Sequence, residues 1–150
     1  MNMIKIINLI NEIISESKIL YFAYGSNMDV ERMKKRCPDA KKLSDGTLHG
    51  WDAFFDEDGI ASIKKSTKND YVNGVVWEIK KSDIKILDKK EGVKVGDYKE
   101  SHVNVKTPDG IKKCLVYIAL DKKPGKPKKE YVKLVKKGEK ENKIKNTFTK

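Results

Sequence analysis

The stretch ILYFAYGSN, from Ile19 to Asn27, predicts a buried strand that is followed directly by a sharp polar turn. Its first six residues are apolar and aromatic, which is typical of a short buried strand, and Gly25-Ser26-Asn27 ends it. A helix is predicted next, with Asn27 or Asp29 as its N-cap and Pro38 beyond its end. Backbone N–H groups in such a turn suit an oxyanion or a carboxylate, although an ordinary strand-to-helix turn is the alternative.

Apolar and aromatic clusters predict at least five strands in all. After the first strand, turn signals of the types DEDG, KND and PDG separate the remaining pieces. These pieces are Leu48 to Phe55, Ile60 to Ile63, Val72 to Ile79, Tyr98 to Lys106 and Lys112 to Leu120. So many strands in a short chain predict an α+β fold with a curled sheet or small mixed β-barrel and flanking helices.

Helical spacing of apolar residues predicts an extra amphipathic helix at the N-terminus, with Ile6, Ile10, Ile13 and Ile14 on one face. This face needs a partner. We favour the domain itself, with a homodimer through this helix as the open alternative. A last helix is predicted from Glu130 to Lys137, and the residues from Asn142 to the C-terminus are expected to fray.

The length of 150 residues fits one domain. We divide the chain into an N-terminal helical extension (1–18), a domain (19–142) and a basic tail (143–150). The net charge of +11 raises the question of nucleic acid, but only Arg32 and Arg36 among the 33 basic residues are arginines. Without arginine forks or interleaved aromatics, we expect no specific nucleic-acid partner and a lysine-rich solvated surface.

Metal, disulfide and targeting signals are weak. Cys37 and Cys114 lack a ligand spacing and are expected to be reduced thiols, and His49 and His102 are equally isolated. The acidic run before Gly59 is better explained by a hairpin turn than by a cation site. We expect no cofactor and no metal. No stretch reaches the length of a membrane span and no cleavage site follows the N-terminus, so a cytoplasmic protein without a membrane partner is predicted.

One glutamate stands where helical spacing calls for an apolar residue. Ser82 is a candidate cap for a helix that ends near Gly92, and Ile84, Leu87 and Glu91 fall on one face of it. Burial and the negative end of the helix dipole both disfavour the charged carboxylate, so the Glu91 pKa is expected to be raised. A raised pKa suits general acid–base chemistry near neutrality. A frayed helix end with Glu91 in water is the structural alternative.

Four motifs occur in an order that resembles the γ-glutamylcyclotransferase family, which includes AIG2-like proteins. They are YFAYGSN at 21–27, GVVW at 74–77, LDKKEGVKVGDY at 87–98 and PKKEYVKLVKKGEKEN at 127–142. The resemblance covers about residues 19 to 142 and implies a small β-barrel with flanking helices. The stretch between Pro38 and Gly59 is shorter than in the family, and the first 18 residues exceed its usual start.

The resemblance also implies an activity. A γ-glutamyl substrate attacks its own γ-carbonyl and leaves as 5-oxoproline, with Glu91 as general acid and base and no cofactor. The implied substrate-binding residues are Tyr21, Phe22, Ala23, Tyr24, Gly25, Ser26, Asn27, Tyr98 and Tyr131. The leaving group is either an amino acid or another amine. A non-catalytic basic binding module on the same fold is the rival from another class.

Overall fold

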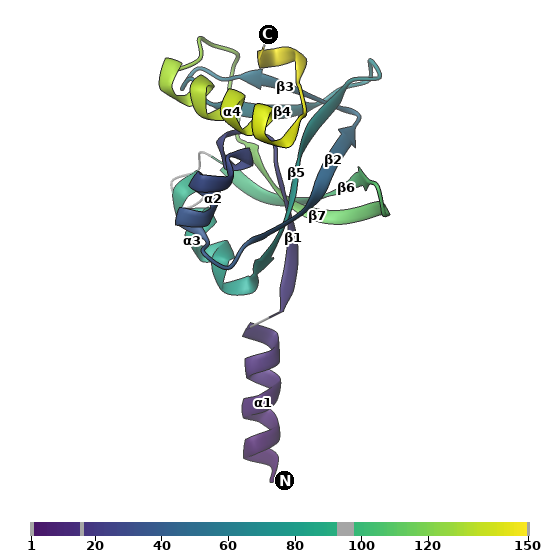
Figure 1. Ribbon diagram of the computed structural model, residues 1–150, viewed down its shortest axis with the longest axis vertical. Helices are drawn as coiled ribbons and strands as arrows, with labels where there is room; N and C mark the ends of the chain where they lie inside the picture. Colours follow the sequence, from purple (N-terminus) through teal and green to yellow (C-terminus); the bar gives the residue numbers. More distant parts are fainter. Residues whose placement is uncertain (1, 16, 93–97, 150) are drawn as a thin grey trace.

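A closed barrel of five strands in the order β1-β5-β2-β6-β7 forms the body of the protein (Figure 1). The computed structural model describes residues 2–15, 17–92 and 98–149. Strand β1 runs antiparallel to β5 and parallel to β7, so the barrel is mixed. Strands β3 and β4 form a separate two-stranded sheet. The predicted α+β fold with a small mixed barrel is therefore confirmed.

The elements follow one another along the chain with short connections. The strands are β1 (Lys18–Ala23), β2 (Lys41–His49), β3 (Trp51–Phe55), β4 (Ala61–Lys65), β5 (Tyr71–Lys80), β6 (Tyr98–Thr107) and β7 (Gly110–Ala119). The helices are α1 (Met3–Ser15), α2 (Val30–Arg36), α3 (Lys81–Glu91) and α4 (Lys129–Asn142), with 3-10 turns η1 (Ser26–Met28) and η3 (Thr147–Thr149). Residues 93–97 of the third sequence motif lie outside the described residues.

Strand β1 is buried on both faces, which explains its continuous apolar sequence. Alternation along the strand sends Tyr21 and Ala23 into a core shared with the helices, while Phe22 packs into the second core inside the barrel. The ring of Phe22 lies over Gly74 of β5, where an added Cβ would come within 2.8 Å of the ring. The glycine of the GVVW motif thus lets β1 and β5 pack closely.

Three boundaries differ from the sequence predictions. Strand β2 begins at Lys41, ahead of the apolar run, and Gly50 at a φ of 84° separates it from β3. The last helix continues past Lys137 to Asn142. The predicted fraying of the C-terminal residues is wrong, because Asn146 and Thr149 are buried and donate hydrogen bonds to Glu139 Oε2 at 2.8 Å each.

Helix α1 forms as predicted but stands away from the barrel (Figure 1). The side chains of Met3 and Ile4 are 68% and 70% exposed, so the favoured packing of this helix on the domain is wrong for its described side chains. Lys81 and Ser82, at the start of α3, are exposed to solvent near the point where α1 joins the barrel. None of the described helices is long and apolar enough to cross a membrane.

Candidate active site

A narrow cavity opens where β1 ends, beside the end of α3 and the first turn of α4. Six elements contribute to it, namely β1, η1, β4, α3, β7 and α4, and these come from distant parts of the chain. Its lining residues are Tyr21, Phe22, Tyr24, Gly25, Ser26, Asn27, Ala61, Glu91, Tyr117 and Tyr131. Eight of the ten predicted site residues are therefore brought together here, at the polar turn that follows the first strand.

Glu91 is the only carboxylate among the described residues that line this cavity. It ends α3, whose Leu87 is fully buried, and Gly92 follows in the left-handed conformation with a φ of 71°. The helix begins at Lys81 rather than after the predicted cap Ser82, because the Asp83 carboxylate accepts a hydrogen bond from Lys80 N at 3.0 Å. Burial raises the Glu91 pKa to about 7, while nearby Arg36 and Arg32 oppose this shift.

Asn27 ties the turn to the wall of the cavity. Its side-chain amide donates to Tyr21 Oη at 3.0 Å and its carbonyl oxygen accepts from Arg36 Nη1 at 2.8 Å. Its backbone carbonyl accepts from Trp77 Nε1 at 3.1 Å, so the tryptophan of the GVVW motif holds the same turn. The side chain of Asn27 therefore does not cap α2. Asp29 occupies the N-cap position, also without a side-chain capping bond.

Gly25 and Tyr131 meet across the mouth of the turn. A Cβ built on Gly25 would lie 2.5 Å from the Tyr131 hydroxyl oxygen, so no larger residue fits without movement. The backbone N–H of Ser26 donates to the same oxygen over a long 3.4 Å. Burial raises the pKa of Tyr131, so the hydroxyl stays protonated near neutral pH. A long bond of this kind leaves the Ser26 N–H available to a stronger acceptor.

Two predicted site residues do not line the cavity. Ala23 lies in the core below it, and the Tyr98 hydroxyl bonds to Asp56 Oδ2 at 3.2 Å and Ala61 O at 3.0 Å. Asp56 is fully buried and also accepts from Ser62 Oγ at 2.7 Å, so this network fixes the β3–β4 turn beside the cavity. Tyr98 thus supports the wall at Ala61.

The sequence analysis missed Ala61 and Tyr117 as lining residues. Both lie on strands, in β4 and β7, with small or apolar neighbours that carry no chemical signal. The Tyr117 hydroxyl donates to Asp88 Oδ1 of α3 at 2.7 Å, and its backbone oxygen accepts from Tyr24 Oη at 2.8 Å. Tyr117 therefore joins the helix that carries Glu91 to the strand that carries the turn. Only the three-dimensional pairing of β1 with β7 reveals it.

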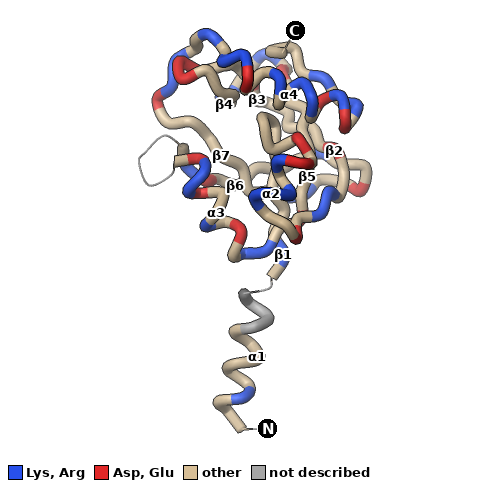
Figure 2. Tube along the Cα trace, turned by 60° about the vertical axis from the view of Figure 1, so that its left-hand side comes forward, with Lys and Arg blue, Asp and Glu red and all other residues tan. Residues whose placement is uncertain are grey.

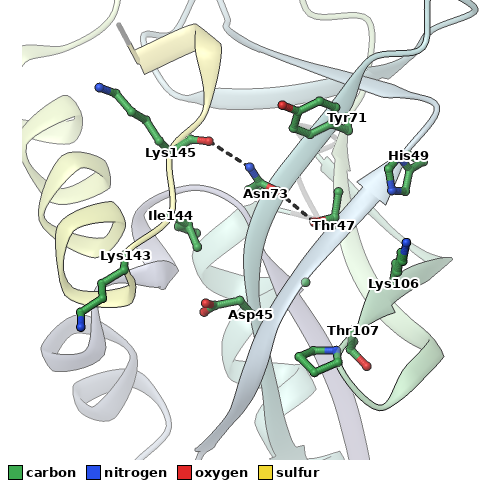
Figure 3. A pocket seen from close by; sticks show the side chains of 12 residues that line it. Asp45, Thr47, His49, Tyr71, Asn73, Lys106, Thr107, Lys143, Ile144 and Lys145 are labelled. Carbon is green, nitrogen blue, oxygen red and sulfur yellow. Dashed lines mark hydrogen bonds between the residues drawn. The ribbon is translucent and has the colours of Figure 1, made fainter.

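A larger and more open pocket of about 690 Å³ lies elsewhere, beside β2, β5 and the C-terminal segment (Figure 3). Asn73 donates to Lys145 O and accepts from Thr47 Oγ1, each at 2.9 Å, so these contacts fasten the C-terminal segment to the barrel. None of the predicted site residues lines it. No group of three metal-ligating side chains occurs in the described parts of the chain. We therefore take the smaller cavity at Glu91 as the candidate active site.

Comparison with known proteins identifies relatives of this chain. Residues 71–150 match the model of the AIG2-like family. The γ-glutamylcyclotransferase of Homo sapiens is 38% identical over 138 residues, which span 85% of this chain and 73% of the human protein. That of Mus musculus is 38% identical over 82% of this chain and 71% of its own length.

Solved structures show the same relationship. A γ-glutamyl cyclotransferase superposes with a TM-score of 0.79 at 35% identity, over 84% of this chain and 80% of its own. YkqA from Bacillus subtilis superposes with a TM-score of 0.75 at 27% identity, over 97% of this chain and 55% of its own. These similarities confirm the enzyme family that the four ordered motifs predicted. The chain belongs to the γ-glutamylcyclotransferase family.

Proposed function

We propose that the cavity at Glu91 converts a γ-glutamyl substrate into 5-oxoproline and a free amine, with Glu91 as the proton carrier. The observation that carries this proposal is the position of one carboxyl group, with its pKa near 7, beside a turn that offers backbone N–H groups. A carboxyl group with such a pKa accepts and returns a proton efficiently near neutral pH. The rival reading as a non-catalytic basic module gives no reason for a titratable acid in this cavity.

The bond changes are internal to the substrate. Its α-amino nitrogen attacks the γ-carbonyl carbon, and Glu91 takes one proton from that nitrogen. The tetrahedral oxygen that develops accepts hydrogen bonds from the turn, where the Ser26 N–H is held only loosely by Tyr131. The C–N bond to the leaving group then breaks, and Glu91 returns the proton to the departing nitrogen. The lactam ring closes without a covalent enzyme intermediate.

Ring closure profits from proximity. The nucleophile and the carbonyl belong to one molecule, and well-oriented intramolecular reactions gain up to about 7–11 kcal/mol from proximity. The free volume of the cavity is about 20 Å³, which is close to the space of a single water. Substrate binding therefore requires the lining side chains to move apart. Tyr131, on α4, packs directly against the turn at Gly25, so a movement of its side chain away from the turn would enlarge the cavity.

Replacing Glu91 tests the proposal. Because acid–base assistance is worth about 10²–10⁴-fold, Glu91→Gln should lower kcat for 5-oxoproline formation by a comparable factor. The matched control is Glu57→Gln, at an exposed glutamate in the β3–β4 turn, which should retain full activity. Near-normal turnover by a folded Glu91→Gln protein would contradict the assignment.

A further inference from the structure

We propose that Arg32 is a specificity-determining residue that binds a carboxylate on the leaving group of the γ-glutamyl substrate. This inference rests on the proposed function of the Glu91 cavity. It starts from a second cavity, of about 500 Å³, which is open to solvent and lined by residues of α2, α3 and α4. Helices α2 and α3 lie side by side there in both views (Figures 1 and 2).

This second cavity adjoins the candidate active site through two neighbouring residue pairs. Lys90 lines the second cavity, whereas the next residue, Glu91, lines the first. Arg36 lines the second cavity and donates to Asn27, which lines the first. A substrate with its γ-glutamyl part at the turn can therefore direct its leaving group between Glu91 and Asn27 toward α2.

The second cavity is lined mainly by basic side chains, and that of Arg32 has a buried donor without a hydrogen-bond partner among the described residues. Arg32 and Arg36 are one helical turn apart on α2, so their like charges face the same side. That donor is the Nε atom of Arg32. Leaving a buried donor unpaired destabilises a protein. The unpaired Nε–H of Arg32 therefore suits an acceptor on a bound ligand.

Two carboxylates that line this second cavity, those of Asp29 and Glu31, are already engaged. Lys137 of α4 binds Asp29 Oδ1 at 3.0 Å and Glu31 Oε2 at 3.1 Å. Within the described part of the chain, no carboxylate lies within 4.0 Å of either guanidinium group. Lys35, by contrast, does reach Glu31 at 3.6 Å. Helix α2 thus pairs Lys35 internally and Arg36 with Asn27, and leaves Arg32 for an external anion.

The chemistry of the ligand follows from the guanidinium group. Arginine binds planar carboxylates through two parallel N–H···O bonds, and such charge-assisted bonds are strong where water is partly excluded. A leaving group that is an amino acid brings a carboxylate a few bonds from the scissile nitrogen, whereas a simple alkylamine brings none. Arg32 therefore favours the amino-acid leaving group over the amine.

A matched pair of substrates isolates this effect. γ-Glutamyl-alanine and γ-glutamyl-ethylamide share the same glutamyl part, including its α-carboxylate, and differ in whether the leaving group carries a carboxylate. The wild-type kcat/KM should favour the dipeptide. In Arg32→Gln the value for the dipeptide should fall by about 10- to 100-fold, with that for the ethylamide little changed, as expected for the loss of a charge-assisted bond. Lys34→Gln, on the same helix but outside the cavity, should alter neither value.

The comparison uses the pH-independent plateau of kcat/KM, where Glu91 is fully ionised in both proteins. A change in the Glu91 pKa therefore does not affect the result. Arg32→Glu should reverse the preference toward a cationic leaving group, tested with γ-glutamyl-ethylenediamine. If Arg32→Gln does not fold, the wild-type preference itself must shrink as salt screens the ion pair. Equal loss for both substrates, or an active wild type without any preference, would overturn the role of Arg32 alone. A wild type that releases no 5-oxoproline from either substrate would overturn the proposed function as well.

Discussion

The hydroxyl oxygen of Tyr131 occupies the place that a side chain on residue 25 would need, because a Cβ built on Gly25 would lie 2.5 Å from it. The next contact of this Cβ would be Ala61 Cβ at an ordinary 3.4 Å. Two segments more than 100 residues apart in the chain therefore pack closely at Gly25. The YGSN turn and the tyrosine of α4 are coupled by packing as well as by the Ser26 N–H.

We expect Gly25→Ala to lower both stability and 5-oxoproline formation. Overpacking in a buried site typically costs about 1–3 kcal/mol, and here the alanine methyl group would push Tyr131 off the turn. The free energy of unfolding from urea titration and kcat/KM for γ-glutamyl-alanine measure the two effects.

The double variant Gly25→Ala/Tyr131→Phe supplies the control, because it removes the clashing oxygen and leaves the ring, whose nearest carbon would be 3.7 Å away. It should be more stable than the sum of the two single variants predicts. Strict additivity of the two stability changes would mean that a clash with the Tyr131 hydroxyl is not the cause of the destabilisation by Gly25→Ala.

The raised Glu91 pKa makes both rate and stability depend on pH. As the acting base, Glu91 must be ionised, so kcat/KM should rise with pH through about 7. Stability should move the other way. The folded pKa lies above the ordinary value of 4.5, so the folded state holds its proton more tightly and loses this stabilisation as pH rises from about 4.5 to about 7.

Thermal melting of wild type and Glu91→Gln across this range separates Glu91 from other titrating groups. The difference in Tm between the two should grow in favour of Glu91→Gln as pH rises, because glutamine carries no charge to bury. Parallel Tm curves over the whole range would show that the Glu91 pKa is not raised in the folded protein.

The sequence allowed the barrel and much of the site to be predicted because its signals are local. Apolar strands between turn residues indicated the sheet, and the three-and-four spacing on α3 singled out Glu91. Six of the seven residues from 21 to 27 line the cavity, and their proximity follows from their adjacency in the chain.

The parts that were missed depend on contacts between distant segments. Tyr117 enters the cavity only because β1 and β7 close the barrel, with Tyr21 opposite Leu115. Asn27 has the sequence position of a helix cap, yet its side chain bonds to Tyr21 and Arg36 instead. Local propensity does not encode this competition between a cap and a tertiary partner.

The C-terminal segment illustrates the same limit and provides another prediction. Glu139 is buried on α4 and accepts hydrogen bonds from Asn146 N and Thr149 Oγ1, both at 2.8 Å. Glu139→Ala would leave Asn146 N without its acceptor and Thr149 Oγ1 with only its bond to Asn146 O at 2.9 Å. We expect a loss of about 1–3 kcal/mol in the free energy of unfolding. Lys140→Ala, at the exposed neighbouring position, should change it little, and an equal effect of both variants would rule out a specific role for the carboxylate.

Helix α1 is the element whose removal should matter least to the barrel. Its described apolar side chains are largely exposed, and the helix is mostly tan in Figure 2, in contrast to the highly charged barrel and its helices. A variant that lacks residues 2–15 should keep the wild-type Tm and kcat/KM, because none of the described residues that line the cavity at Glu91 belongs to α1. Light scattering of both proteins at several concentrations would then test the homodimer alternative. A change from dimer to monomer on truncation would assign a pairing role to α1. A fall in Tm with an unchanged number of subunits would show that α1 stabilises the barrel directly.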